Sequence, residues 1–315
     1  MKLNRREFLA SAGLVAAAAT AGCSPAFGPA LVRRNERRVL RTLHGIPTVD
    51  GAGVRLTRII GQPGLRNLDP FLLLDRFHSD DPDAYIRGFP DHPHRGFETV
   101  TVMRVGRMRH ADSRGNRGVI AGGGAQWMTA GRGIVHSEMP EQEKGLLSGF
   151  QLWVNLPAAE KMCAPGYQDL EPERLASCTF SPLGSRVEVI AGEVEGLVGP
   201  VKERPTRPLL AYAMLEDERP LRLELPEEHT AFVFVAAGEV EIGPDSSPVR
   251  EGQIALLSPG NRMSVRAAGQ RGEILVAAGR PLREPIVQRG PFVMNTEQEI
   301  RQAFADYRAG ILGRD

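Results

Sequence analysis

Residues 89–105 read Phe-Pro-Asp-His-Pro-His-Arg-Gly-Phe-Glu-Thr-Val-Thr-Val-Met-Arg-Val, and Gly106 follows directly. The second half of this stretch is rich in β-branched and apolar residues, which is typical of a strand that ends at a glycine turn. A similar run, Ala-Phe-Val-Phe-Val-Ala-Ala at 231–237, ends at Gly238. A Gly-rich turn and another apolar run follow in both places. This internal similarity predicts a duplicated β-barrel.

The two barrels are expected in tandem, one in residues 45–160 and the other in residues 180–282. The whole chain has 35 Gly and 24 Pro, scattered between short apolar runs, which favours an all-β fold with many tight turns. Aligning Gly106 with Gly238 places Glu224 and Pro226 where the first copy has a histidine pair. The second barrel is therefore expected to be degenerate and metal-free.

The 315 residues carry 39 Lys and Arg against 38 Asp and Glu, a formal net charge of +1. Without a basic block or stripe, this balance gives no reason to propose a nucleic-acid partner, and none is expected. Three cysteines are too few for a disulfide framework or a zinc ribbon. The sequence leaves open whether Cys163 and Cys178 pair with each other.

Residues 1–30 are interpreted as an export signal and tether. Arg5 and Arg6, followed by Phe-Leu and an almost uncharged run at 11–22, resemble a twin-arginine signal. The apolar run is short for a membrane span. We expect export to the periplasm by the twin-arginine route.

Residues 20–23, Thr-Ala-Gly-Cys, also resemble a lipobox, in which Cys23 would be acylated. Cleavage near Ala26 or Ala30 is the alternative. Contact with a membrane is expected only through the signal or through a lipid on Cys23, and the chain is expected to be a monomer.

The tail, residues 283–315, is expected to contain a short helix. Thr296 and Glu299 have the spacing of a capping box at its start. One apolar stripe follows at helical spacing, formed by Ile300, Phe304 and Tyr307. Such a stripe needs a partner surface, so we expect the helix to pack onto a barrel.

Five side chains form the candidate metal site. On an extended strand, residues two apart share a face, so His92, His94 and Glu98 point the same way if their segment stays extended. His136 and Glu138 share a face of another strand for the same reason. Imidazole and carboxylate ligands suit Fe, and also Mn, Ni, Co or Cu. Glu98 could be a ligand, could orient an imidazole, or could form hydrogen bonds within the barrel.

Three apolar residues lie beside these candidate ligands in the sequence. Phe97, Trp127 and Met128 could line an apolar mouth for a planar aromatic substrate. Ordinary barrel packing is the alternative for each of them.

Longer motifs at the same residues resemble the pirin family, bicupin proteins of the cupin superfamily. The matching stretches are DPFLLLD at 69–75, FPDHPHRGFETVT at 89–101, QWMTAGRGIVHSEMP at 126–140, LWVNLP at 152–157 and GPFVMNT at 290–296. The resemblance covers residues 45–310. One departure is the turn Ala-Gly-Gly-Gly-Ala at 121–125, where pirins usually carry a Pro-Gly-Asp-like turn.

The resemblance implies two cupin barrels, with one metal, usually iron, in the first. Carried over residue by residue, the ligands would be His92, His94, His136 and Glu138. Glu98 matches the general cupin glutamate, which in pirins is not expected to bind the metal. The second barrel is expected to be metal-free, as in pirins.

Two functions follow as hypotheses. The first is a metal-dependent dioxygenase that acts on flavonols such as quercetin, with dioxygen as co-substrate and Glu138 as the catalytic base. The second is a non-catalytic iron-binding redox sensor or protein-interaction module of the cell envelope. A metal-free barrel with relic motifs is the least specific reading.

Overall fold

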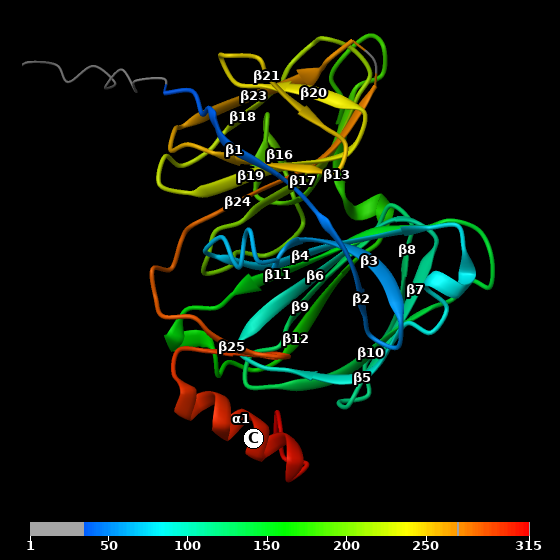
Figure 1. Ribbon diagram of the computed structural model, residues 1–315, viewed down its shortest axis with the longest axis vertical. Helices are drawn as coiled ribbons and strands as arrows, with labels where there is room; N and C mark the ends of the chain where they lie inside the picture. The colour runs from blue at the N-terminus through cyan, green and yellow to red at the C-terminus, as the bar shows by residue number, and fades with distance from the viewer. Residues whose placement is uncertain (1–34, 270, 315) are drawn as a thin grey trace, which may run out of the picture. The chain divides into compact units, whose positions relative to one another are not determined.

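The computed structural model describes residues 35–269 and 271–314 (Figure 1). The expected export signal, the lipobox and Cys23 lie outside the described residues. Within them the structure is almost entirely β, and the strands form two barrels, each made of a seven-stranded and a four-stranded sheet. This confirms the tandem-barrel prediction.

In the first barrel the seven-stranded sheet has the order β12-β9-β6-β11-β4-β3-β2, formed by Gly166–Leu170, Ala125–Thr129, Phe97–Val105, Leu147–Asn155, Phe71–Ser79, Val54–Ile60 and Ile46–Asp50. The facing sheet has the order β5-β10-β7-β8, formed by Phe89–His94, Ile134–Pro140, Arg107–Asp112 and Arg117–Ala121.

In the second barrel the corresponding sheet has the order β1-β22-β19-β24-β17-β14-β13, formed by Val39–His44, Gln253–Leu257, Thr230–Ala237, Gly272–Gly279, Leu209–Leu215, Arg186–Ala191 and Ala176–Thr179. Its partner has the order β18-β23-β20-β21, formed by Leu221–Glu224, Arg262–Ala267, Glu239–Ile242 and Ser247–Arg250. The described residues also form two hairpins: β15-β16 (Glu193–Val194 and Leu197–Val198) and β25-β26 (Val287–Arg289 and Phe292–Met294). There are three short 3₁₀ helices among them: Pro82–Ala84, Ala158–Glu160 and Pro172–Arg174.

Six strands of each large sheet follow the chain in the same way: β9-β6-β11-β4-β3-β2 corresponds to β22-β19-β24-β17-β14-β13. The seventh strand, at one edge, comes from a different part of the chain in each barrel. In the first barrel that edge is β12, which pairs antiparallel with β9. In the second barrel the same place is taken by β1, which pairs antiparallel with β22 although it begins the described chain (Figure 1). The segment before residue 45 therefore completes the second barrel, and the strand after residue 160 completes the first.

Strand alternation divides the side chains of β6 between two environments. Val100 and Val102 face the second barrel and join a core that also contains Phe232 and Phe234. Met103 faces the interior of the first barrel and packs in a separate cluster. The two large sheets therefore contact each other through their outer faces, while their inner faces are free to build separate interiors.

The interiors of the two barrels differ in chemistry. The second barrel is filled by aliphatic side chains, including the inward residues Leu221 and Leu223 of β18 and Met263 and Val265 of β23. Glu224 and Pro226, the residues that the alignment placed at the histidine pair, are exposed, and the inward positions of β18 hold the two leucines. The second barrel therefore offers no imidazole on these strands.

The tail returns to the first barrel. Helix α1 (Glu297–Arg308) begins with the predicted capping box between Thr296 and Glu299. Its residues Ile300 and Ala303 pack with Phe292 of β26 and, from β10, Val135. Phe304 packs on the same cluster, so the helix packs onto a barrel as the apolar stripe predicted. Figure 1 shows the helix beside the first barrel. Among the described residues, no helix has both the length and the apolar character that a membrane span requires.

Candidate metal centre

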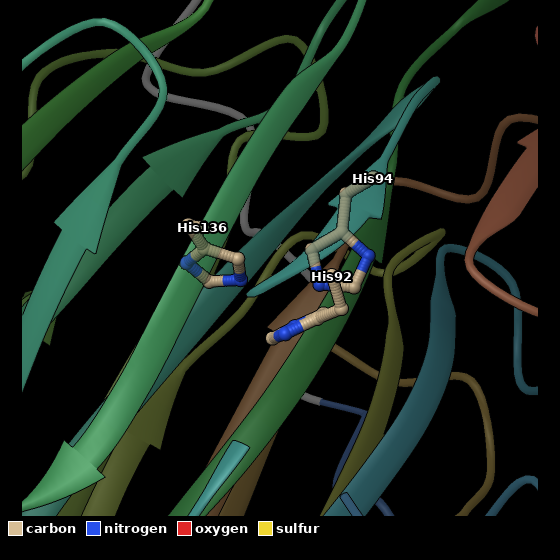
Figure 2. A group of neighbouring side chains, drawn as sticks. All are labelled: His92, His94 and His136. Atoms are coloured by element: carbon tan, nitrogen blue, oxygen red, sulfur yellow. The ribbon is translucent and has the colours of Figure 1, made fainter. Parts of the chain in front are cut away.

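Three histidines converge on the inner face of the small sheet of the first barrel (Figure 2). His136 of β10 lies directly opposite His92 of β5, and His94 follows two residues later on the same face. The ring centroids are 4.4 Å apart for His92 and His136, 4.6 Å for His92 and His94, and 5.0 Å for His94 and His136. One ring nitrogen from each residue lies within 4.8 Å of the others, so a single ion could bind all three.

Two of these imidazoles, those of His94 and His136, have a lowered pKa, which favours the form that binds metals. Burial lowers the pKa of His136 to about 4, although Glu138 opposes the shift. Burial, and then the neighbouring His92 and His136, hold the pKa of His94 well below its ordinary value. The rings of His94 and His136 are therefore neutral at pH 7 when no ion is bound, and each neutral ring has a lone pair to donate.

The hydrogen bonding of the rings also fits a metal. His136 is 1% exposed, and neither of its ring nitrogens has a hydrogen-bond partner among the described residues. His92 Nδ1 lies 2.9 Å from the carbonyl oxygen of Pro90, which fixes the N–H at Nδ1 and leaves Nε2 as the donor atom. A buried imidazole without partners is costly, and a divalent ion would satisfy it.

Glu138 lies outside the three-histidine group. Its carboxylate is buried and accepts hydrogen bonds from Thr101 Oγ1, at 2.8 Å, and from Gln151 Nε2, at 2.7 Å. The strand register shifts between His136 and Glu138 on the β5 side, and both hydrogen-bond donors to the carboxylate lie on the opposite sheet. The structure brings together the three imidazoles; ligation by Glu138 stays a prediction.

Glu98 does not share a face with the histidine pair, because its segment does not stay extended. β5 ends at His94, and Gly96, with φ near +90°, turns the chain into β6 of the other sheet. Glu98 shares the outer face of β6 with Val100, where it accepts a hydrogen bond from Thr129 Oγ1 at 2.7 Å and forms an ion pair with Arg204 from the second half of the chain. Of the three roles considered for Glu98, hydrogen bonding within the fold is the one that the structure shows.

A cavity of about 590 Å³ opens beside the imidazoles. His92, His94 and Trp153 are among its walls. Its remaining lining combines apolar residues with charged and amide groups: Leu73, Phe89, Pro90, Pro291, Asp50, Arg58, Asp75, Asp91, Gln151 and Gln288, together with Gly51, Ala52 and Gly290. The size and mixed lining suit a small organic ligand.

The three predicted pocket residues do not line this cavity. Trp127 lies opposite Val100 and therefore faces the second barrel. Met128 faces inward but is covered by Ile134 and Tyr167. Phe97 is fully buried behind the wall, with its ring 4.4 Å from Trp153 and 5.1 Å from His94.

The apolar wall comes instead from Trp153, Leu73 and Phe89. Closeness in sequence to the ligands was the wrong signal, because a neighbour on a strand points to the other face. Gln151 and Trp153, two residues apart on β11, share the inner face and line the cavity. Cys163 and Cys178 are free and form no disulfide.

Comparison with known proteins agrees with this geometry. Residues 53–154 match the Pirin family, and residues 210–313 match the Pirin C-terminal cupin domain. The chain belongs to the pirin family. Each matched segment covers most of one barrel, and the histidine cluster lies in the first of them.

Pirin relatives match nearly the whole chain. A Pseudomonas aeruginosa protein, for which quercetin 2,3-dioxygenase activity is proposed in its name, is 48% identical over 282 residues, 88% of this chain and 98% of the relative. Pirin of Homo sapiens is 44% identical over 263 residues, 82% of this chain and 88% of the relative. The crystal structure of quercetin 2,3-dioxygenase from Acinetobacter baumannii has a TM-score of 0.82 and 34% identity, covering 88% of this chain and 99% of that one.

Proposed function

We propose that this pirin is a metal-dependent dioxygenase that acts on flavonols such as quercetin. The observation that carries the proposal is the convergence of three imidazoles, two of them in the wall of a 590 Å³ cavity with an aromatic side and a polar side. The structural similarity to a quercetin 2,3-dioxygenase supports the same reaction class.

The metal would be held by His92, His94 and His136, with Glu138 as the proposed fourth ligand. Iron(II) is our choice, and Mn, Ni, Co and Cu are compatible with the same donor atoms. When bound, the ion would supply Lewis-acid and redox chemistry for the reaction with dioxygen.

The protein's own groups prepare the substrate. Each oxygen of the Glu138 carboxylate accepts one hydrogen bond and keeps a further lone-pair position. We assign Glu138 as the general base that takes the proton of the flavonol hydroxyl. Thr101 and Gln151 hold the carboxylate in place, and Trp153 offers an aromatic surface for the planar ring system.

The proposal is tested by quercetin consumption in air with the full chain loaded with Fe(II). We expect metal-dependent loss of quercetin that is absent in His136→Ala, which also loses its metal. In Glu138→Gln, kcat should fall by about 100-fold or more. His44→Ala, at an exposed histidine of β1, is the matched control and should behave like wild type. A protein that keeps its metal but does not consume quercetin would contradict the proposal and favour the redox-sensor or interaction-module hypothesis.

We also propose that the protein is exported by the twin-arginine route to the cell envelope, on the basis of Arg5 and Arg6. Fractionation of cells that express the full chain tests this. An Arg5→Lys/Arg6→Lys variant should remain in the cytoplasm, and a cytoplasmic wild-type protein would contradict export. Cys23→Ser distinguishes a lipid anchor from simple cleavage.

A further inference from the structure

A row of polar side chains crosses the inner face of the large sheet in the first barrel. Arg58 of β3 lies directly opposite Asp75 of β4, Asp75 opposite Gln151 of β11, and Gln151 opposite Thr101 of β6. The row continues through Gln126 of β9 to Asp169 of β12. Residues that are directly opposite share a face of the sheet, so the whole row points into the barrel.

The row is joined to the metal centre by Glu138. This carboxylate reaches across the barrel and accepts from two members of the row, Thr101 and Gln151. On one side of that junction, Gln126 donates to Asp169 at 2.7 Å, and neither residue lines the cavity. On the other side Arg58, Asp75 and Gln151 all line it. The row therefore has an inner half and a half that faces the cavity.

The half that faces the cavity contains an ion pair with unused hydrogen-bonding capacity. Arg58 donates from Nε to Asp75 Oδ1 at 3.0 Å and from Nη2 to Asp75 Oδ2 at 2.7 Å. Arg58 Nη1 and Gln151 Oε1 have no hydrogen-bond partner among the described residues. Asp75 is 5% exposed. Arg58 is partly exposed, and an ion pair with one buried partner is a weak source of stability, so its place in a ligand cavity calls for another role.

An apolar rung runs parallel to this polar row. Leu73 and Trp153 lie directly opposite each other, two residues along the same strands from Asp75 and Gln151. Both also line the cavity. Neighbouring strands are about 4.8 Å apart, so the distance from Gln151 to Arg58, two strands away, is roughly 10 Å. A flat aromatic system of two or three rings could pack on Leu73 and Trp153, with its hydroxyl groups against the polar row.

We propose that Arg58, Asp75 and Gln151 bind the hydroxyl groups that the substrate carries away from its metal-binding oxygen. They would select polyhydroxylated aromatic compounds over the unsubstituted ring system. This inference rests on the proposed function, which assigns the other end of the substrate to the metal centre. The guanidinium N–H groups and the amide and carboxylate oxygens provide both donors and acceptors for such hydroxyls.

The test compares two flavonols under nitrogen, where no turnover occurs. Quercetin and 3-hydroxyflavone share the hydroxyl-ketone unit, but the second lacks the other ring hydroxyls. Each is titrated into the full chain loaded with Fe(II), and quenching of tryptophan fluorescence reports binding because Trp153 lines the cavity. The variants are Asp75→Asn and the double variant Arg58→Met/Asp75→Leu. The matched control is Arg266→Met/Glu241→Leu, which removes an ion pair of 2.5 Å on the second barrel.

Wild type and control should bind quercetin at least about tenfold more tightly than 3-hydroxyflavone, since a site built to bond a hydroxyl rejects the analogue without it. In the double variant the two affinities should agree within about threefold, with the metal content unchanged. Asp75→Asn keeps the shape and should lose part of the preference, which keeps the test valid if the double variant does not fold. Equal affinities in wild type, or a preference that survives in a metal-loaded double variant, would overturn the inference.

Turnover in air separates this inference from the proposed function. A preference that the variants abolish, in a protein that does not consume quercetin, would support the polar row and contradict the dioxygenase. If the protein consumes quercetin but binds quercetin and 3-hydroxyflavone equally well, the result would support the dioxygenase and contradict the role of the polar row.

Discussion

Gly96 links the histidine pair to the C-terminal segment. Its φ is near +90°, and a Cβ at this position would lie 2.0 Å from the carbonyl oxygen of Val293. The backbone of the tail thus passes directly over the end of β5, two residues after His94. Glycine is required here both by conformation and by the close approach.

We predict that Gly96→Ala lowers the free energy of unfolding by about 3 kcal/mol, from backbone strain and the forced displacement of the tail. Urea unfolding measures it. Gly115→Ala is the matched control, because Gly115 has the same φ of 90° but no atom within 4 Å of the added Cβ. The control should cost only about 1 kcal/mol. Equal losses in the two variants would show that the contact with Val293 does not matter.

Lys161 connects the same two segments, the end of β5 and the C-terminal segment. Its ammonium group donates to the carbonyl oxygens of Gly96, at 2.7 Å, and Val293, at 3.1 Å, and to Asn155 Oδ1, at 2.6 Å. The side chain is 1% exposed, and burial lowers the pKa of Lys161 to about 8 from 10.5.

This pKa shift predicts a pH-dependent stability. Between pH 8 and 10.5 the folded chain binds fewer protons at Lys161 than the unfolded chain, so the contribution of this residue to stability rises with pH. The free energy of unfolding of wild type relative to Lys161→Met should increase by about 2 kcal/mol from pH 7.5 to 9.5. Chemical unfolding of both proteins across this range measures the difference. A difference that does not change with pH would contradict the shifted pKa.

At the residue scale, the sequence identified the histidines but not their surroundings. The x-His-x-His spacing predicts a shared face within one strand, and the structure brings His92, His94 and His136 together. The sequence left several roles open for Glu98 and Trp127, because their positions depend on where a strand breaks and on which face meets the second barrel. Those facts come from the turn at Gly96 and from strand pairing across the fold, which local spacing does not contain.

At the scale of elements, the exchange of edge strands is the main feature that the sequence did not predict. The helix could be predicted because its capping box and apolar stripe are local signals. The partner of β1, by contrast, is β22, more than half the chain away. The residues before β1 are also tied to the second barrel, since the fully buried Arg37 donates to the carbonyl oxygens of Ser258 and Pro226.

This arrangement predicts the effect of truncation. A chain that begins at residue 45, the expected start of the first barrel, lacks β1 and leaves the edge of β22 unpaired. Its melting temperature should be at least about 10 °C lower than that of a chain that begins at residue 35, equivalent to a loss of roughly 3 kcal/mol or more. Thermal unfolding of the two truncated proteins checks this. Equal melting temperatures would mean that β1 contributes little to the second barrel.

At the scale of the whole molecule, the two barrels share a fold but differ in the chemistry of their interiors. The second is packed with aliphatic side chains, while the first keeps imidazoles, a polar row and a cavity. The ion pairs Arg204–Glu98 and Arg104–Glu188 connect the two halves of the chain. The duplication was readable from the repeated strand–glycine pattern, but these long-range contacts and the cavity were not.

The central claim is that the first barrel carries out a dioxygenase reaction at its histidine cluster. The most direct measurement is simultaneous recording of dissolved oxygen and quercetin in a sealed cell with the Fe(II)-loaded full chain. The account predicts one molecule of dioxygen consumed per molecule of quercetin, at a rate proportional to protein and reduced to the level of free Fe(II) by His136→Ala. Metal-loaded protein that consumes no more oxygen than free Fe(II) would contradict the account.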